Sequence, residues 1–600
     1  MGNPLIIEGL TVAYRSRSGS LNTILAEVDL RLEPGEVLGL AGESGCGKST
    51  LALCATGYQA RGSEVLAGRV KLGDVSLLDL TLAQRRAVWG KRIAMVAQSA
   101  SGALNPGLTI GVHLEQTLRT HVSGDTASLR RQQIELLESV GLPDPDRALR
   151  RFPHEFSGGQ QQRIAIALAI ACRPDVLILD EPTTGLDVTT QAKITKLLQE
   201  LFSRYEMAAL YVSHDLPLLS TIADRLAVMY AGRIVESAPC RDLFSSPAHP
   251  YTRALLASAP GRDRRRLIGI QGGPPPGAVK DACAFAPRCT YAAPECTAGG
   301  VALKQIGCSH TARCKRLSEI PRTPAKKIPA PPSPSAVGAP LLTLSDMTCS
   351  YGTFKAVSGV NLSISPGEIV GIFGESGSGK TTLLRSVAGV VTPSAGQLLF
   401  DDRPLPGLSR RSQQQRKDIQ LVFQDPNACL NPRHDAAAIL ARPLALFRPE
   451  LADDPARARA IEELFDIVNL PRSVATRRPG QLSGGQKQRL SLARALAAKP
   501  RLLLCDEITS ALDVSVQAVV VEVLRDLVAR TGVAVVFVSH DLGVVRSLCD
   551  RAIVMQHGNI REAGDTETLF AHPRHDYTRT LLSAEPELPV EAFSEAVVAT

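Results

Sequence analysis

Two glycine-rich segments far apart in the chain have the residue types and spacing of a loop that binds phosphate. The first reads GESGCGKST at residues 42–50 and the second GESGSGKTT at residues 374–382, and both fit the pattern G-x-x-x-x-G-K-[ST]. In such a loop, backbone N–H groups surround the phosphates, the lysine reaches the β- and γ-phosphates, and the hydroxyl of the next residue binds Mg²⁺. The residues predicted to bind nucleotide in these loops are Gly42, Ser44, Gly45, Cys46, Gly47, Lys48, Ser49, Thr50, Gly374, Ser376, Gly377, Ser378, Gly379, Lys380, Thr381 and Thr382.

Each loop is followed by the same shorter motifs in the same order: a glutamine, a Ser-Gly-Gly-Gln segment, an Asp-Glu pair and a histidine. Equivalent residues lie 326 positions apart from the glutamines Gln98 and Gln424 to the histidines His214 and His540. Alone, an acidic pair or a histidine would more simply be a surface or core residue. Repeated in register, the series indicates two copies of one architecture fused in one chain.

Apolar segments of strand length stand before these motifs. Residues 28–32 end at a Pro-Gly-Glu turn, and residues 37–41 and 369–373 run directly into the two glycine loops. Residues 208–212 and 534–538 precede the two histidines. Strands that alternate with helical stretches predict an α/β fold with a largely parallel core sheet, and strand, glycine loop and helix is the context that the loop motif needs.

The stretch between the two halves differs from both in composition. Residues 321–340 are rich in Pro, Ala and Ser, which predicts an extended, semi-rigid linker, and five cysteines are clustered just before it. The predicted boundaries are 1–262 for the first nucleotide-binding domain, 263–320 for a cysteine-rich extension, 321–340 for the linker, 341–582 for the second nucleotide-binding domain and 583–600 for a flexible tail.

The composition is that of an ordinary soluble protein, with 44% hydrophobic and 21% charged residues among 600. A net charge of +8 is mild, and a solvated surface explains it better than a nucleic-acid or membrane surface. The first residues lack the regions of a signal peptide, and no stretch approaches the ~18 apolar residues of a membrane span. Thirteen cysteines in such a chain argue against a disulfide framework. We therefore expect a cytosolic protein.

The Ser-Gly-Gly-Gln segments separate one class of ATPase from the many that share the loop. They read FSGGQ at residues 156–160 and LSGGQ at residues 482–486, and we call them the signature segments. With the ordered series, they make the chain resemble the ATP-binding cassette (ABC) superfamily over nearly its whole length. In that family, the signature segment opens a helix that points at the γ-phosphate held by the opposite cassette. The resemblance implies that the two halves close head to tail around two ATP molecules, as an intramolecular pseudo-dimer.

The resemblance also implies a role for each motif residue. The glutamate of each Asp-Glu pair polarises the attacking water and the histidine contacts the γ-phosphate, so both sites are predicted to hydrolyse ATP. The implied catalytic residues are Glu181, His214, Glu507 and His540. The implied residues around Mg²⁺ are Ser49, Gln98, Asp180, Thr381, Gln424 and Asp506. The other implied ATP-site residues are two tyrosines that stack on adenine, the signature segments and two aspartates of the loops that couple the sites: Tyr14, Tyr351, Ser157, Gly158, Gly159, Gln160, Ser483, Gly484, Gly485, Gln486, Asp187 and Asp513.

Two further features resemble the oligopeptide and dipeptide permease branch of this superfamily. One is the His-Pro-Tyr-Thr-Arg sequence that starts at His249, echoed by His-Asp-Tyr-Thr-Arg at His575. Its simpler interpretation is the start of an ordinary amphipathic helix. The other is a set of cysteines that in that family holds an iron–sulfur cluster, here expected to be [4Fe–4S]. The implied ligands are Cys283, Cys289, Cys296 and Cys308, with Cys314 and His310 as spare candidates. Zinc and unligated core cysteines stay open as alternatives.

The resemblance therefore implies the ATP-hydrolysing subunit of a bacterial peptide importer at the cytoplasmic face of the cell membrane. Its implied partners are two integral-membrane permease subunits and an extracytoplasmic peptide-binding lipoprotein, with no nucleic acid. Nickel, glutathione and opines stay open as cargo. The main rival is a soluble, ribosome-associated iron–sulfur ATPase with twin cassettes, although that family carries two clusters in an N-terminal domain. This sequence has no fused membrane spans, which disfavours a typical fused exporter. It also has no long zinc-bearing insertions within the cassettes, which disfavours a DNA-repair cassette protein.

Overall fold

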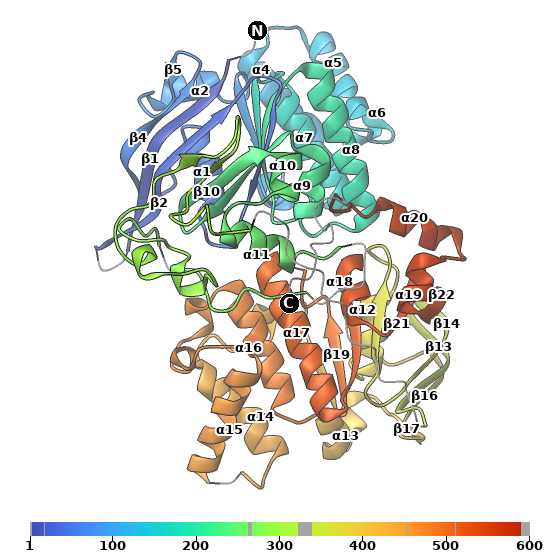
Figure 1. Ribbon diagram of the computed structural model, residues 1–600. Helices are drawn as coiled ribbons and strands as arrows, with labels where there is room; N and C mark the ends of the chain where they lie inside the picture. The colour runs from blue at the N-terminus through green and yellow to red at the C-terminus, as the bar shows by residue number, and fades with distance from the viewer. Residues whose placement is uncertain are drawn as a thin grey trace.

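The computed structural model describes residues 3–16, 19–261, 267–275, 277–321, 339–451, 453–510 and 512–589. The first half of the chain (residues 3–321) lies above the second half (residues 339–589) in Figure 1, and the order of elements is nearly the same in both. The tandem α/β architecture expected from the sequence is therefore confirmed.

The first half contains two sheets and the helices that cover them. Its strands are β1 (Leu5–Arg15), β2 (Leu21–Leu32), β3 (Val37–Ala41), β4 (Ser63–Leu72), β5 (Val75–Ser76), β6 (Ile93–Val96), β7 (Val176–Asp180), β8 (Ala208–Val212), β9 (Arg225–Tyr230), β10 (Arg233–Pro239), β11 (Lys304–Gln305) and β12 (Thr311–Ala312). Its α-helices are α1 (Lys48–Ala55), α2 (Leu82–Val88), α3 (Ala100–Ala103), α4 (Ile110–His121), α5 (Thr126–Ser139), α6 (Pro145–Ala148), α7 (Gly158–Ile170), α8 (Val188–Tyr205), α9 (Leu216–Ile222), α10 (Cys240–Ser245) and α11 (Pro250–Ser258).

The second half repeats this plan. Its strands are β13 (Leu342–Tyr351), β14 (Phe354–Ile364), β15 (Ile369–Phe373), β16 (Ala395–Phe400), β17 (Arg403–Pro404), β18 (Ile419–Val422), β19 (Leu502–Asp506), β20 (Ala534–Val538), β21 (Arg551–Gln556) and β22 (Asn559–Asp565). Its α-helices are α12 (Lys380–Val387), α13 (Gln413–Asp418), α14 (Ala436–Phe447), α15 (Asp454–Ile467), α16 (Gly484–Leu496), α17 (Val514–Thr531), α18 (Leu542–Leu548), α19 (Thr566–Ala571) and α20 (Asp576–Ala584).

A mostly parallel core sheet in each half positions the glycine loops. Its order is β11-β12-β10-β9-β3-β8-β7-β6 in the first half and β18-β19-β20-β15-β21-β22 in the second. The central strands β3 and β15 are buried along their whole length, because helices cover both faces of such a sheet and favour continuous apolar runs. Each glycine loop therefore leaves the carboxyl end of a central strand. An antiparallel sheet, β2-β1-β4-β5 or β14-β13-β16-β17, packs beside each core sheet.

A cysteine-rich segment (residues 277–321) joins the first core sheet. Its short strand β12 pairs antiparallel with β10, so the hairpin of β11 and β12 extends the sheet of the first half. Near the start of the predicted extension, Leu267 is fully buried in the core of the second half. The linker residues 322–338 lie outside the described part of the chain.

The two halves contact each other reciprocally. Helix α11 of the first half packs on α17 of the second, and α20 packs on α8. Val188 belongs to the core of the second half and Val514 to that of the first. At the start of the predicted tail, α20 continues through Ala584, and Leu588 is buried in the first half. Residues 590–600 are outside the described ranges.

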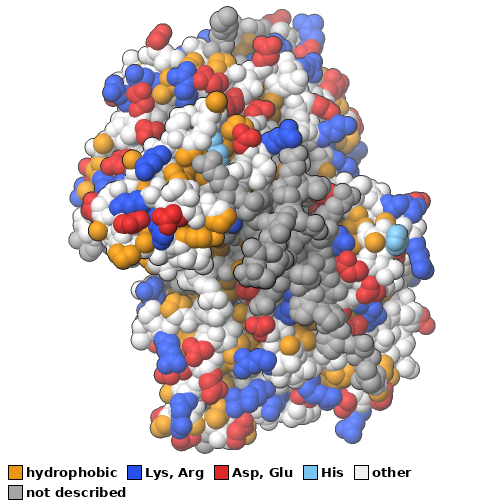
Figure 2. Space-filling view, in the orientation of Figure 1, with side chains coloured by type: hydrophobic (Ala, Val, Ile, Leu, Met, Phe, Trp, Pro, Cys, Tyr) orange, Lys and Arg blue, Asp and Glu red, His pale blue; other side chains and the backbone are white. Residues whose placement is uncertain are grey.

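The surface carries charges of both signs. On the face shown in Figure 2, lysines and arginines are interspersed with aspartates and glutamates over both halves, so the net positive charge is not gathered on this face. Within the described ranges, the helices are too short or too polar for one of them to cross a bilayer.

Candidate functional site

The two glycine loops have the conformation that phosphate binding requires. Gly42 has a φ of 152° and Gly374 a φ of 146°, and a Cβ at either position would lie 2.1 to 2.2 Å from a backbone oxygen. Only glycine fits such a close approach. Lys48 Nζ donates to the carbonyl oxygens of Gly42 and Glu43 at 2.7 and 3.0 Å, and Lys380 makes the equivalent bonds. Both lysines thus curl over their own loops, where the terminal phosphates of a nucleotide would lie.

A hydroxyl and a carboxylate meet beside each loop. Ser49 Oγ donates to Asp180 Oδ1 at 3.2 Å, and Thr381 Oγ1 donates to Asp506 Oδ1 at 3.0 Å. Burial raises the pKa of both aspartates above the usual value. Oxygen pairs of this kind suit Mg²⁺, which keeps several waters and takes few protein ligands. The two predicted metal positions therefore have a fitting donor set.

The first Asp-Glu pair continues into a network of polar side chains. Glu181 accepts from Gln98 Nε2 at 2.9 Å and from Thr184 Oγ1 at 3.1 Å, and its carboxylate lies 3.2 Å from His214 Nδ1. Burial opposes ionisation of Glu181, but the bond and charge of His214 outweigh it and lower its pKa to about 2. Burial lowers the pKa of His214 while Glu181 raises it, with a net rise. The glutamate is therefore ionised and the histidine favours its charged form.

The second network has the same members with slightly different spacing. Gln424 Nε2 donates to Glu507 Oε2 at 2.7 Å, and His540 Nδ1 lies 3.8 Å from that oxygen. The bond to His540 lowers the pKa of Glu507. Glu181 and Glu507 both have a φ near 48°, a left-handed conformation that costs free energy for a residue other than glycine. Both glutamates are therefore held in the same unusual pose.

Each glycine loop also touches the other half. The Ser44 N–H donates to Asp513 Oδ2 at 3.2 Å, and the Ser376 N–H bonds to the carboxylate of Asp187. Asp187 and Asp513 cap the N-termini of α8 and α17. The next turn adds a second bond, from Thr189 Oγ1 to Glu375 Oε1 at 2.8 Å. Each glycine loop thus contacts the aspartate that caps a helix of the opposite half, which is the arrangement of a head-to-tail pair.

The signature segments begin helices α7 and α16. Ser157 and Ser483 are the N-caps. Gln160 and Gln486, the predicted ATP-site glutamines, accept hydrogen bonds from the backbone N–H of those serines at 3.1 and 3.0 Å, as members of capping boxes. A Cβ on Gly159 would meet Thr190, one residue from Thr189. The first signature segment therefore lies on the side of its half that faces the second glycine loop.

The same relation holds in the other direction. A Cβ on Gly485 would lie 2.7 Å from Val516, next to Ser515, whose hydroxyl donates to Glu43 of the first glycine loop.

The predicted adenine-stacking tyrosines lie at the ends of strands in the two antiparallel sheets. Tyr14 is half-buried near the end of β1, and Tyr351, the last residue of β13, is 51% exposed, so its ring has a free face.

The sequence did not predict a role for the tyrosines of α11 and α20. Tyr251 Oη accepts a hydrogen bond from the Glu43 N–H at 2.9 Å, and Tyr577 Oη accepts one from the Glu375 N–H at the same distance. The sequence that starts at His249 is repeated at His575, and this repeat was the only sign of a shared role for the tyrosines. It did not show which residues the tyrosines contact. Both last helices therefore hold the glycine loop of their own half.

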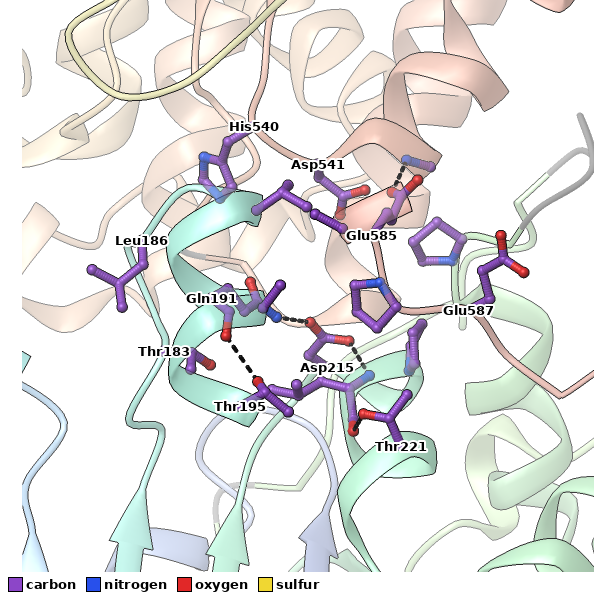
Figure 3. A pocket seen from close by; sticks show the side chains of 18 of the residues that line it. Thr183, Leu186, Gln191, Thr195, Asp215, Thr221, His540, Asp541, Glu585 and Glu587 are labelled. Atoms are coloured by element: carbon purple, nitrogen blue, oxygen red, sulfur yellow. Dashed lines mark hydrogen bonds between the residues drawn. The ribbon is translucent and has the colours of Figure 1, made fainter. Parts of the chain in front are cut away.

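A cavity of about 1140 Å³ lies between the halves. Figure 3 shows Gln191 and Asp215 on one side of it and His540, Asp541 and Glu585 on the other. Asp215 accepts from Gln191, and Glu585 accepts from the Gly543 N–H at 2.7 Å. Burial, followed by the charge of Asp541, raises the pKa of Glu585 well above its usual value. This carboxyl group follows directly on α20, and its burial favours the protonated form.

The cysteine-rich segment brings four thiols to one small cavity, and one of them is not the predicted one. Cys283, Cys289, Cys296 and Cys314 line it, whereas Cys308 is exposed in the turn between β11 and β12. Cys314, a spare candidate in the sequence analysis, lies at the cavity because β12 returns the chain to it. His310, the other spare candidate, bonds to Glu236 at 2.8 Å. In the described part of the chain, no three His, Cys, Asp or Glu side chains are arranged to hold a metal ion.

Comparisons with known proteins agree with this geometry. A family model described as "ABC transporter" matches residues 25–184 and 357–510, and one described as "Oligopeptide/dipeptide transporter, C-terminal region" matches residues 235–296 and 561–595. The oligopeptide transport ATP-binding protein OppD of Mycobacterium tuberculosis is 39% identical, over 98% of this chain and 99% of that protein. The chain belongs to the ABC transporter family. It is an ABC ATPase with two cassettes, which hydrolyses ATP with Mg²⁺ in a process coupled to transport.

Two other proteins are similar to this ABC ATPase over most of its length. The glutathione import ATP-binding protein GsiA of Salmonella typhimurium is 34% identical, over 97% of this chain and 89% of that protein. A model of ribosome-bound archaeal Pelota and ABCE1 matches with a TM-score of 0.54 at 18% identity, over 92% of this chain and 78% of that chain. At that identity the likeness shows only the twin-cassette fold, so it does not favour the ribosomal alternative.

Proposed function

We propose that the chain is the motor subunit of a peptide importer, in which the two halves form two composite ATP sites. The observation that carries this proposal is the crossing of the loops: Ser44 of the first half contacts Asp513, and Ser376 of the second contacts Asp187. A chain whose halves worked separately would have no need of such contacts. The two relatives whose printed names include oligopeptide transport and glutathione import support cargo of the peptide type.

In this proposal each site combines residues of both halves. Site one uses the first glycine loop and its network and is capped by the second signature segment, and site two is the reverse. The residues of site one are Lys48, Ser49, Gln98, Asp180, Glu181, His214, Ser483, Gly484 and Gly485. The residues of site two are Lys380, Thr381, Gln424, Asp506, Glu507, His540, Ser157, Gly158 and Gly159. The positions of Gly159 beside Thr190 and of Gly485 beside Val516 support this pairing.

The chemistry follows from the charges in each network. In site one, the ionised Glu181 accepts a hydrogen bond from the attacking water and orients it toward the γ-phosphate. His214, with a raised pKa, offers positive charge where negative charge develops. Ser49, Asp180 and Gln98 would hold Mg²⁺, which neutralises phosphate charge when bound. Gln98 bonds to Glu181 here, so it links the metal position to the water-activating carboxylate.

The test of two working sites is Glu181→Gln and Glu507→Gln, separately and together. Each single change should lower ATP turnover to about half or less, and the double change should lower it by at least about 10²-fold, the contribution expected of a general base. Glu200→Gln, an exposed position on α8, is the matched control and should turn over ATP normally. Full ATPase activity in either single variant would contradict the two-site proposal.

We further propose that two membrane permease subunits bind at the surfaces near Gln98 and Gln424, on the cytoplasmic face of the membrane, and that an extracytoplasmic lipoprotein delivers the cargo. Pull-down of the tagged chain from gently solubilised cells should recover two multi-span proteins and a binding lipoprotein. Uptake of labelled di- and oligopeptides, with glutathione, nickel and an opine as competitors, would then identify the cargo. Ribosomal proteins without membrane subunits would contradict the importer proposal.

We further propose a [4Fe–4S] cluster held by Cys283, Cys289, Cys296 and Cys314, because these four cysteines line one small cavity. The donor type and number fit, and a cluster would fix the fold of the segment when bound. Burial raises the pKa of Cys289 to about 11, so iron would have to displace a proton from this thiol. Anaerobically purified protein should contain about four irons per chain and absorb in the visible range, and Cys314→Ser should reduce both while Cys308→Ser does not. Loss with Cys308→Ser instead would restore the original ligand set.

A further inference from the structure

An arginine of the cysteine-rich segment forms a buried ion pair with the first glycine loop. Arg288 Nη1 donates to Glu43 Oε2 at 2.6 Å and Arg288 Nη2 donates to Glu43 Oε1 at 2.9 Å. The two side chains are 5% and 2% exposed. This is the two-pronged geometry in which a guanidinium binds a carboxylate most strongly.

The pair completes the bonding of Glu43. Its N–H donates to Tyr251 and its carbonyl oxygen accepts from Lys48. Its carboxylate also accepts from Ser515 Oγ, which belongs to the second half. Because a buried carboxylate without its cation is strongly destabilising, the position of Glu43 depends on Arg288. Glu43 is in turn the residue before Ser44, whose N–H faces Asp513.

Within the described ranges, the second glycine loop lacks an equivalent ion pair. Glu375 repeats the bonds of Glu43 to a tyrosine and to the opposite half, through Tyr577 and Thr189. Among the residues that the structure describes, however, no arginine or lysine pairs with Glu375, and this glutamate is only half-buried. The two ATP sites therefore differ in the support of the loop, although their catalytic residues match.

The position of Arg288 is set by the cysteine-rich segment. It ends a 3₁₀ turn, Ala286–Arg288, that lies between Cys283 and Cys289. Its Nε donates to the carbonyl oxygen of Gln271 at 3.0 Å, and its Nη1 donates to Tyr230 Oη at 3.2 Å. A change that orders or disorders the two cysteines flanking this turn should therefore also order or disorder the guanidinium group of Arg288.

We propose that Arg288 is a positioning residue for the first ATP site alone, through which the folding of the cysteine-rich segment controls the affinity of that site for nucleotide. Arg288 does not touch the reacting atoms; it acts through Glu43. The second site keeps its affinity when the segment is disturbed. This inference rests on the proposed composite sites. It implies that the two ATP sites have the same catalytic residues but that only the first is regulated by the cysteine-rich segment.

The test measures nucleotide binding to each half separately in the full-length chain. A protease site is placed within residues 322–338, the chain is photolabelled with 8-azido-ATP over a range of concentrations, and the label is counted on each half after cleavage. Arg288→Gln should raise the half-saturating concentration for the first half by about 10-fold or more and for the second half by less than about 2-fold. In a Glu507→Gln background, the same change should raise the KM for ATP while kcat changes little, as expected for a loss of binding rather than of chemistry.

Matched variants separate this role from general destabilisation. Glu43→Gln should act like Arg288→Gln, whereas Glu375→Gln should have a smaller effect on the second half, and Arg288→Lys should restore part of the affinity. Arg92→Gln breaks another ion pair of the first half, with Asp175 at 3.1 Å, at the opposite ends of the strands, and should leave labelling unchanged. If Arg288→Gln does not fold, the combined variant Arg288→Met with Glu43→Gln removes both charges and should fold while keeping the weakened first site.

The outcomes are distinct. Equal effects on both halves, or no effect on the first, would overturn the positioning role. Failure of the unmodified chain to label in either half would instead overturn the proposed function, since no ATP site would then exist to be positioned.

Discussion

In the first site, the carboxylate of Glu181 lies 3.2 Å from Nδ1 of His214. Because the two groups carry opposite charges when His214 is protonated, this pair makes the stability of the folded protein depend on pH. The pKa of His214 is raised above its ordinary 6.5, so its contribution to stability is complete below about 6.5 and is lost as the pH rises through the folded value. The pKa of Glu181 is lowered from 4.5 to about 2, so its contribution is complete above about 4.5 and is lost as the pH falls toward 2. Both contributions are present between these limits.

The prediction is that His214→Gln destabilises the nucleotide-free protein most near pH 5.5. The loss should be about 1.5 to 3 kcal/mol, the range for a hydrogen bond to a charged group, and it should shrink at pH 8.5. Melting curves of the first half's transition at several pH values would show it. With Glu181→Gln already present, adding His214→Gln should give no pH-dependent loss. An equal loss at pH 5.5 and 8.5 in the otherwise unmodified chain would contradict the assignment of charges.

At the scale of elements, the last helix of each half acts as a support for the glycine loop. Tyr251→Phe removes the acceptor for the buried N–H of Glu43, and Tyr577→Phe does the same for Glu375. Each change should cost about 1 to 3 kcal/mol and weaken nucleotide binding in its own half, as measured by labelling each half. Tyr205→Phe, at the end of α8, is the control. Weaker binding in the opposite half would mean that the tyrosines act across the interface instead.

The sequence predicted the elements that depend on their own residues. Strands β3, β8, β15 and β20 have the expected bounds, because each is a continuous apolar run that ends at a glycine or a polar residue. Strand β2 begins at Leu21 rather than at residue 28, because Asn22 and Thr23 are held in the sheet by pairing with β1 and not by their own propensity.

The parts of the site that could not be predicted depend on residues far apart in the chain. The bond from Glu43 to Tyr251 spans 208 positions, and that from Arg288 to Glu43 spans 245. The sequence analysis named Cys308 as the fourth cluster ligand and Cys314 as a spare candidate, because spacing alone does not show which of the two lies near Cys296. The turn of the hairpin of β11 and β12 places Cys314 at the cavity and leaves Cys308 exposed.

For the whole molecule, the exchange of buried side chains predicts that the halves stay together without nucleotide. Leu267 lies in the core of the second half and Leu588 in that of the first. After cleavage at a protease site within residues 322–338, the halves should co-elute in gel filtration. Leu267→Asp with Leu588→Asp places unpaired charges in both cores, which costs several kcal/mol, and should separate them. Leu446→Asp, at a position 55% exposed, should not. Separation of the unsubstituted halves would show that the linker alone holds them.

The pairing of β12 with β10 has a consequence for solubility. In the first half, β10 reads RIVESAP and is almost entirely buried, and the hairpin pairs with its outer edge at Glu236 and Ser237. In the second half, β22 is the outermost strand of the described sheet, reads NIREAGD, and alternates with exposed charges. An uncovered sheet edge invites pairing with another chain, and charges prevent it. The cysteine-rich segment therefore covers part of the edge of β10, whose charged residues Arg233 and Glu236 are buried, whereas the uncovered edge strand β22 carries exposed charges that should limit pairing with another chain.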